Sequence, residues 1–178
     1  RGYRLETGKA PLREDLAYAF LLAAGWKPLA IHARQDSQEM SMYNAFLDPF
    51  CGSGTIPIEA ASMASGLPPG RLLSAPFRGT HLHDPDSWEK LVMKALKKSA
   101  GIESKVQISA SDRDKGGLEI TKSNAKRAGV FGMIDVQHCA LPGHPWLEDA
   151  AHTPDRMLMA ANPTFGRPVS PLGPNDRI

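Results

Sequence analysis

The stretch NAFLDPFCGSGTIPIEAASMA, residues 44–64, decides the fold of this chain. Asn44 to Asp48 has the pattern of a short strand, and Ile56 to Ala64 combines good helix formers with apolar periodicity. The turn that joins them, DPFCGSGT, contains two glycines, which let a backbone bend sharply and approach a ligand closely. The stretch therefore predicts a strand, a glycine turn and a helix in succession.

Strands and helices alternate along the rest of the chain. We expect strands at 106–111, 134–138 and 157–161, the last of them buried, and helices at 11–24, 86–99 and 114–128. This alternation predicts an α/β fold with a doubly wound, mostly parallel sheet. Residues 66–104 are expected to be an insertion between the first two core strands. Because only Arg167 to Ile178 follow Gly166, we expect the fourth strand at an open edge and the C-terminal strands to be missing.

Composition indicates one globular domain without a membrane span. The chain has 178 residues, of which 42% are hydrophobic and 22% charged. Its longest apolar run falls far short of the roughly 20 residues that a transmembrane helix needs. The two cysteines have no paired spacing, so we expect a reducing compartment, the cytoplasm. A net charge of +2 permits a polyanionic partner without requiring one.

The glycine turn is predicted to bind the amino-acid end of a cofactor. In open α/β sheets, ligands bind beyond the carboxyl ends of the strands, and amides at a helix start can receive a carboxylate. Asp48 can hold an ammonium group, and this pair of charges favours S-adenosylmethionine over a dinucleotide pyrophosphate. We expect Cys51 to fill space in the turn rather than act as a nucleophile. The predicted cofactor residues of the turn are Asp48, Pro49, Cys51, Gly52, Gly54 and Thr55.

A second carboxylate, Asp112, follows the second predicted strand. Such a position commonly binds ribose hydroxyls. Its distance from the glycine turn exceeds the roughly 20 residues of a dinucleotide fingerprint, which argues against a simple NAD domain. We expect Asp112 to contact the cofactor and Asp114 to cap the next helix.

The segment Asn162-Pro163-Thr164-Phe165 follows the fourth predicted strand and suits an amine substrate. The Asn162 side-chain oxygen and the Pro163 carbonyl can accept the two hydrogens of an exocyclic amine, which lets its nitrogen pyramidalise toward a sulfonium methyl. Phe165 can stack on the base. The predicted catalytic residues are Asn162, Pro163 and Phe165, and the structural alternative is a turn after a strand.

No metal is expected in this chemistry. His81, His83 and Asp84 lie close together in the sequence, but three ligands in one loop without a fourth rarely form a metal site.

Several motifs together resemble the THUMP-associated RNA guanine-N2-methyltransferases, whose UPF0020-type domain has a Rossmann-like class I methyltransferase fold. The resemblance implies one methyltransferase domain over residues 1–178, S-adenosylmethionine as cofactor, and guanosine N2 of ribosomal or transfer RNA as the target. It also implies a THUMP domain before Arg1, which is absent from this sequence. The motifs are RGYR (1–4), APLRE (10–14), DPFCGSGTIPIEAA (48–61), NAKRAGV (124–130) and NPTFGR (162–167).

Two departures from the family pattern keep other functions open. Thr164 and Phe165 stand where the family usually has Pro-Tyr, and His138 and Cys139 stand where it often has an acidic residue. One alternative is a DNA adenine-N6-methyltransferase, because the amine receptor is shared. The other is a degenerate, non-catalytic RNA-binding scaffold. The basic residues Lys94, Lys97, Lys98, Lys122, Lys126 and Arg127 indicate either phosphate contacts or solvated helix faces.

Overall fold

The computed structural model describes residues 2–5, 12–27, 42–75, 77–100, 102 and 104–163. Its four strands form one parallel sheet in the order β3-β2-β1-β4. The predicted parallel α/β fold is therefore confirmed, and the strand order reverses at β1. The strands are β1 (Ala45–Asp48), β2 (Gln107–Asp112), β3 (Ile134–His138) and β4 (Met157–Met159).

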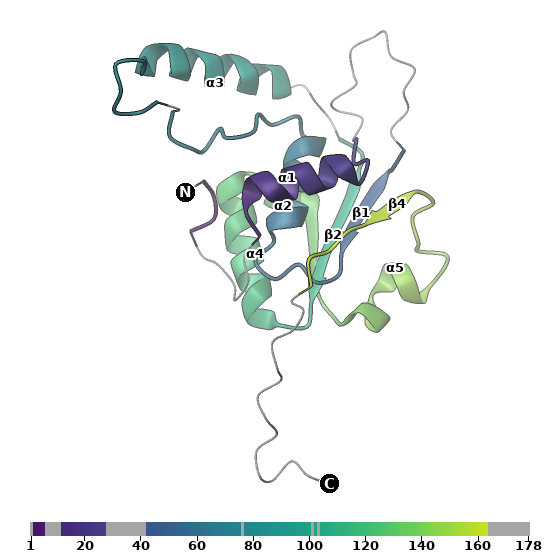
Figure 1. Cartoon of the computed structure of the whole chain (residues 1–178). Helices are drawn as coiled ribbons and strands as arrows, with labels where there is room; N and C mark the ends of the chain where they lie inside the picture. The colour runs from purple at the N-terminus through teal and green to yellow at the C-terminus, as the bar shows by residue number, and fades with distance from the viewer. Residues whose placement is uncertain are drawn as a thin grey trace, which may run out of the picture.

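Three long helices cover the sheet. Figure 1 shows α1, α2 and α4 gathered on one side of the strands. Right-handed crossovers between successive parallel strands account for α2 and α4 sharing that side. Every residue of α2 is buried, because it lies between α1 and the strands. These helices are α1 (Glu14–Ala23), α2 (Thr55–Ala64) and α4 (Lys115–Ala128).

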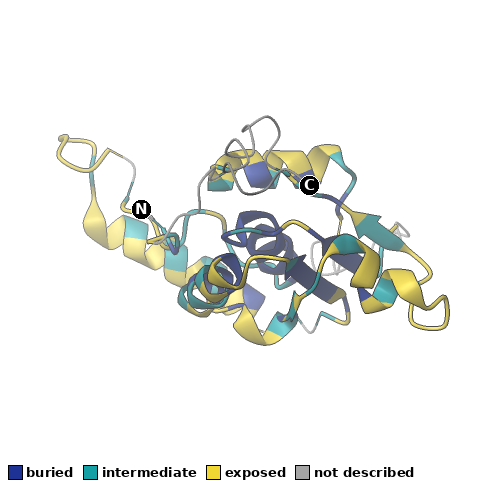
Figure 2. Ribbon diagram, turned by 90° about the horizontal axis from the view of Figure 1, so that it is seen from below, coloured by how far each residue is buried: buried dark blue, intermediate teal, exposed yellow. Residues whose placement is uncertain are grey.

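The core lies between the sheet and these helices. The rings of Trp26 and Phe46 meet edge to face with centroids 5.3 Å apart. The Trp26 indole also donates a hydrogen bond of 3.2 Å to the Ala60 carbonyl, so its one polar group is satisfied. Figure 2 shows the buried residues concentrated at the centre of the molecule. Burial of β1 on both faces fixes the strand from which the glycine turn departs.

The predicted boundaries hold to within a few residues, with one error in burial. We expected residues 157–161 to be a buried strand, but β4 ends at Met159, which is 44% exposed. Among the described strands β4 pairs with β1 alone, so it lies at an edge, as expected. The burial was overestimated because the hydrophobicity of a segment does not determine which other segments pack against it. The predicted start of the first helix, Pro11, lies outside the described residues.

The segment between α2 and β2 carries α3 (Pro85–Ser99), which stands apart from the other helices in Figure 1. Only Ser99 of this helix is buried. Asp84 caps its first turn by accepting hydrogen bonds from the Asp86 and Ser87 amides. Asp84 therefore has a structural role in the loop that also contains His81 and His83. No described helix is both long and apolar enough to cross a lipid bilayer.

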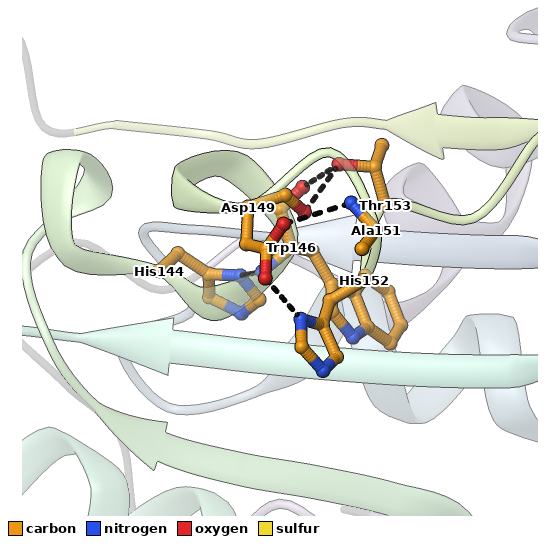
Figure 3. A network of polar contacts seen from close by, with 6 residues as sticks. All are labelled: His144, Trp146, Asp149, Ala151, His152 and Thr153. Carbon is orange, nitrogen blue, oxygen red and sulfur yellow. Dashed lines mark hydrogen bonds and ion pairs between the residues drawn. The ribbon is translucent and has the colours of Figure 1, made fainter.

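The connection from β3 to β4 is held by a network of polar contacts around α5 (Pro145–Glu148), shown in Figure 3. His144 accepts a hydrogen bond from the Trp146 amide, and its other ring nitrogen lies 3.0 Å from the Ser109 hydroxyl on β2. Asp149 binds the His152 ring at 2.8 Å, and the Thr153 hydroxyl donates to the Trp146 carbonyl. The contact between His144 and Ser109 thus ties this connection to β2. Two short 3-10 helices, η2 (Phe131–Met133) and η3 (Leu141–Gly143), flank β3.

Candidate active site

A cavity of about 490 Å³ opens where β1, β2 and β4 end. Carboxyl ends of parallel strands meet at one edge of a sheet, and ligands bind there beside the strand at which the order reverses. In this sheet that strand is β1. Eight residues predicted from sequence line the cavity together: Asp48, Pro49, Cys51, Gly52, Thr55, Asp112, Asn162 and Pro163.

Hydrogen bonds within the glycine turn and to β2 fix its backbone. The Gly54 amide donates to the Cys51 carbonyl at 2.7 Å, and the Cys51 amide donates to the Ser111 carbonyl at 3.0 Å. The Gly52 amide donates to one carboxylate oxygen of Asp112 at 2.9 Å. Gly52 and Gly54 have φ angles of 54° and 81°, in the left-handed region that favours glycine.

Gly54 supports the turn from outside the cavity wall. A Cβ at this position would lie 2.7 Å from the Thr121 methyl group on α4. The residue therefore has to be glycine on two counts, because its φ is positive and because α4 approaches closely. Gly54 is the residue of the predicted motif that the cavity lining does not include.

Asp48 is a buried carboxyl group at the end of β1. Its side chain is 1% exposed and accepts one hydrogen bond, from the Phe50 amide at 3.0 Å. The pKa of Asp48 is raised to about 7, mainly by burial and in smaller part by the nearby Asp112 carboxylate, while the hydrogen bond from the Phe50 amide lowers it. A cation bound in the cavity would favour the ionised form of this group.

Asp112 ends β2 and has both oxygens engaged. One accepts from the Gly52 amide, and the other accepts from the Asp114 amide at 2.9 Å. Each carboxylate oxygen has a second lone pair, so Asp112 can still accept hydrogen bonds from hydroxyl groups. Asp114 accepts from the Gly116 amide at 2.9 Å, which confirms its predicted role as the cap of α4.

Two hydrogen-bonding groups beside the start of α2 have no partner among the described residues. The Thr55 hydroxyl is buried and unpaired, and Thr55 lines the cavity. The Ser53 amide, also in the lining, donates to no described residue. Buried donors without partners are costly in a folded protein. They match a ligand that brings acceptor oxygens, such as a carboxylate.

Cys51 is buried in the turn, with its sulfur 3.8 Å from the Thr121 hydroxyl. Burial raises the pKa of this thiol above its ordinary range, and the Asp48 carboxylate raises it further. Cys51 is therefore a neutral thiol near pH 7. This state fits a space-filling role in the turn and not a nucleophile.

The residues after β4 reach the same cavity. Asn162 is exposed and Pro163 is half-buried, and both line it. The Ala160 amide donates to the Leu47 carbonyl of β1 at 3.0 Å, so pairing of the two strands continues to within two residues of Asn162. Phe165, the third predicted catalytic residue, lies outside the described residues, as does Thr164.

Sequence reasoning missed half of the cavity wall. Phe50 and Ser53 belong to the glycine motif itself, and attention to every residue of the motif would have found them. Leu141 and Pro142 follow β3, and for this region the sequence analysis considered only His138 and Cys139. The His138 ring lies 3.0 Å from the Arg113 carbonyl. The missed lining residues are Leu12, Phe50, Ser53, Ile56, Arg113, Ala140, Leu141 and Pro142.

The cavity can hold a ligand with several kinds of group at once. It offers two carboxylates, unpaired donors at a helix start, an apolar wall at Leu141 and Pro142, and the amide of Asn162. Such a lining suits a zwitterionic molecule joined to a hydroxylated and planar part.

Comparisons with known proteins point to one family. The family model described as UPF0020, RMKL-like, methyltransferase domain, matches residues 1–170. Ribosomal RNA large subunit methyltransferase K/L of Legionella pneumophila (strain Philadelphia 1) is 36% identical over 171 residues, 93% of this chain. The protein of the same name from Allochromatium vinosum is 34% identical over 169 residues, also 93% of this chain. The chain spans 21% of the length of each relative.

Solved structures agree in fold. The crystal structure of a "predicted N6-adenine-specific DNA methylase" from Listeria monocytogenes matches with a TM-score of 0.70 and 27% identity. That match covers 93% of this chain and 38% of the other. The structure of SMU.472 complexed with SAH matches with a TM-score of 0.72 and 26% identity, over 94% of this chain and 38% of the other.

Proposed function

This chain belongs to the UPF0020 family of RMKL-like methyltransferase domains, and we propose that it transfers a methyl group from S-adenosylmethionine to the exocyclic N2 of guanosine in ribosomal RNA. The observation that carries the proposal is the single cavity that joins Asp48, Asp112 and Asn162. The substrate follows the ribosomal RNA methyltransferases that are 34% and 36% identical to this chain.

The residues of the cavity fit the cofactor. The buried, unpaired Thr55 hydroxyl and the Ser53 amide would bind its carboxylate, and Asp48 would bind its ammonium group. Asp112 would accept hydrogen bonds from its ribose hydroxyls, and the apolar wall at Leu141 would contact its adenine. When bound, the cofactor supplies an electrophilic methyl group. The related structure complexed with SAH supports this assignment.

The chain's own contribution to catalysis is alignment of the acceptor. Asn162 and the Pro163 carbonyl would hold the two hydrogens of the guanine amine and orient its lone pair toward the methyl group. Alignment of two reactants in a fixed geometry can supply several kcal/mol of the activation barrier. We keep Phe165 in the proposal as the residue that stacks on the base.

The proposed partner is RNA, and the cytoplasm is the location that a ribosomal RNA substrate suggests. On α3, Lys90, Lys94 and Lys97 are exposed at helical spacing and share one side of the helix. Cations arranged in this way can contact successive phosphates. We also propose that residues 1–178 are one methyltransferase domain with 66–104 as an insertion.

Methylation of adenine N6 in DNA is the second candidate, because the related Listeria structure bears that description. Both reactions use the same amine receptor. The test is transfer of radiolabelled methyl groups to unmodified total RNA and, in parallel, to unmethylated DNA, followed by nucleoside analysis. We expect N2-methylguanosine in RNA. Label recovered as N6-methyladenine in DNA would replace the first function with the second.

Calorimetry distinguishes the third possibility, a non-catalytic scaffold, from the two enzymatic functions. Titration with S-adenosylmethionine is expected to show one binding site in the full chain. Absence of binding, together with retained affinity for RNA, would support the scaffold instead.

A further inference from the structure

Side chains on one side of α4 form hydrogen bonds with the backbone of the glycine turn. Thr121 donates from its hydroxyl to the Gly52 carbonyl at 2.8 Å, and Asn124 donates from its amide nitrogen to the Ser53 carbonyl at 2.9 Å. Both side chains are fully buried. At Gly117, one helical turn before Thr121, a Cβ would lie 3.0 Å from the Gly52 carbonyl oxygen. Residues 117, 121 and 124 therefore share the face that meets the turn.

These contacts set where the amides of the turn point. A trans peptide holds its C=O and N–H in opposite directions. Because Thr121 holds the Gly52 carbonyl toward α4, the Ser53 amide points away from α4, and Ser53 lines the cavity. Because Asn124 holds the Ser53 carbonyl, the Gly54 amide is turned toward the Cys51 carbonyl, to which it donates. No strand ladder holds the carbonyls of these two peptides, and the α4 side chains bind both of them.

Asn124 is itself held in place by Arg127. One guanidinium nitrogen of Arg127 donates to the Asn124 side-chain oxygen at 2.5 Å, and another donates to the Tyr3 carbonyl at 2.8 Å. Tyr3 is buried, and its hydroxyl donates to Glu59 of α2 at 2.8 Å. The chain of contacts thus runs from the N-terminal segment through Arg127 and Asn124 to the Ser53 carbonyl.

We propose that Asn124, oriented by Arg127, is a positioning residue that sets cofactor affinity by fixing the Ser53–Gly54 peptide and linking the glycine turn to the N-terminal segment that carries Tyr3. Neither Asn124 nor Arg127 lines the cavity. The inference rests on the proposed cofactor. It explains why a buried amide, which is costly without partners, occupies the helix face behind the turn.

The test compares three variants of the full chain. Asn124→Asp has nearly the same shape, keeps the oxygen that Arg127 binds, and replaces the donor to Ser53 with an acceptor. Arg127→Met removes the group that orients Asn124. The matched control is Lys126→Met, which removes a neighbouring cation that is exposed and lies over the Phe131 ring.

Two readouts are measured, the dissociation constant of S-adenosylhomocysteine by calorimetry and the Gly54 amide resonance by NMR of the cofactor-free chain. We expect the dissociation constant to rise roughly tenfold in Asn124→Asp and roughly threefold in Arg127→Met, as loss of one buried hydrogen bond allows. The Gly54 resonance shifts in both, and the control leaves both readouts near those of the parent chain.

A merely structural role gives a different result. Asn124→Asp and Arg127→Met would then lower the melting temperature but leave the dissociation constant and the Gly54 resonance as in the parent chain, and this outcome overturns the inference. If the parent chain itself fails to bind the cofactor analogue, the proposed function fails. The role of Asn124 in cofactor affinity fails with it, whereas the Gly54 resonance, which is measured without ligand, still tests whether Asn124 fixes the Ser53–Gly54 peptide.

Discussion

Replacing Asp48 by asparagine is expected to stabilise the cofactor-free chain near pH 8 and to weaken cofactor binding. The pKa of Asp48 rises from an ordinary 3.8 to about 7 because the carboxyl is buried. Below pH 3.8 the group is protonated in the folded and the unfolded chain alike. As pH rises toward 7, the unfolded chain releases the proton while the folded chain retains it, so the free energy of unfolding falls. Above the folded pKa the loss is complete.

The size of the effect follows from the shift. At about 1.4 kcal/mol per pKa unit, a rise from 3.8 to about 7 corresponds to about 4 kcal/mol as an upper limit. Asparagine keeps an oxygen for the Phe50 amide but carries no charge at any pH. For a chain of 178 residues, the variant is expected to melt about 10 °C higher at pH 8 and at nearly the same temperature as the parent chain near pH 4.

Thermal unfolding of both chains between pH 4 and 8, without cofactor, measures this difference. The pKa of Glu59 is also raised to about 7 by burial, but Glu59 is present in both chains and cancels in the comparison. Asp155→Asn, at an exposed position, is the control and should not raise the melting temperature at pH 8. Parallel curves for Asp48→Asn and the parent chain, or a less stable variant at pH 8, would refute the reasoning.

Calorimetry completes the experiment with the cofactor. Asp48→Asn is expected to lose affinity for S-adenosylmethionine by at least tenfold, because no charge remains opposite the ammonium group. A gain in stability together with a loss of binding would show that the buried charge is retained for function.

Three further results are expected. Asn162→Ala should lower methyl transfer at least about 100-fold while the cofactor dissociation constant changes less than about twofold; equal losses in both assays would contradict the role assigned to Asn162. Gly54→Ala should weaken cofactor binding, because its Cβ would meet Thr121 at 2.7 Å. Gly129→Ala, with φ of 74° but nothing within 4 Å of its Cβ, should only lower the free energy of unfolding, by about 1 kcal/mol; equal binding by both glycine variants would be inconsistent with this account. Lys94→Ala combined with Lys97→Ala should weaken RNA binding and reduce the slope of log affinity against log salt by about 2. An unchanged slope would mean that α3 does not contact phosphates.

Much of the site could be predicted from the sequence because its parts are local. Asp48 and Asp112 each end a strand that the sequence predicts, and strands that run parallel bring their carboxyl ends together. The glycine turn was recognisable because left-handed backbone at Gly52 and Gly54 requires that residue type.

Other features had no local signal. Leu12 and Leu141 enter the cavity wall from segments that resemble ordinary apolar sequence. The burial of the fourth strand was overestimated because its apolar sequence resembles that of a core strand. In the structure β4, Met157–Met159, lies at the edge of the sheet.

The sequence by itself determined the succession of strands and helices, the glycine turn and the two carboxylates at strand ends. These follow from periodicity and backbone preference, which act between residues close together in the chain. Only the tertiary structure decided that Asp48 is buried enough to raise its pKa to about 7. It also decided that Asn124 of α4 donates a hydrogen bond to the Ser53 carbonyl. Both depend on which atoms from distant segments displace water around a side chain, and that is settled only when the whole core is packed.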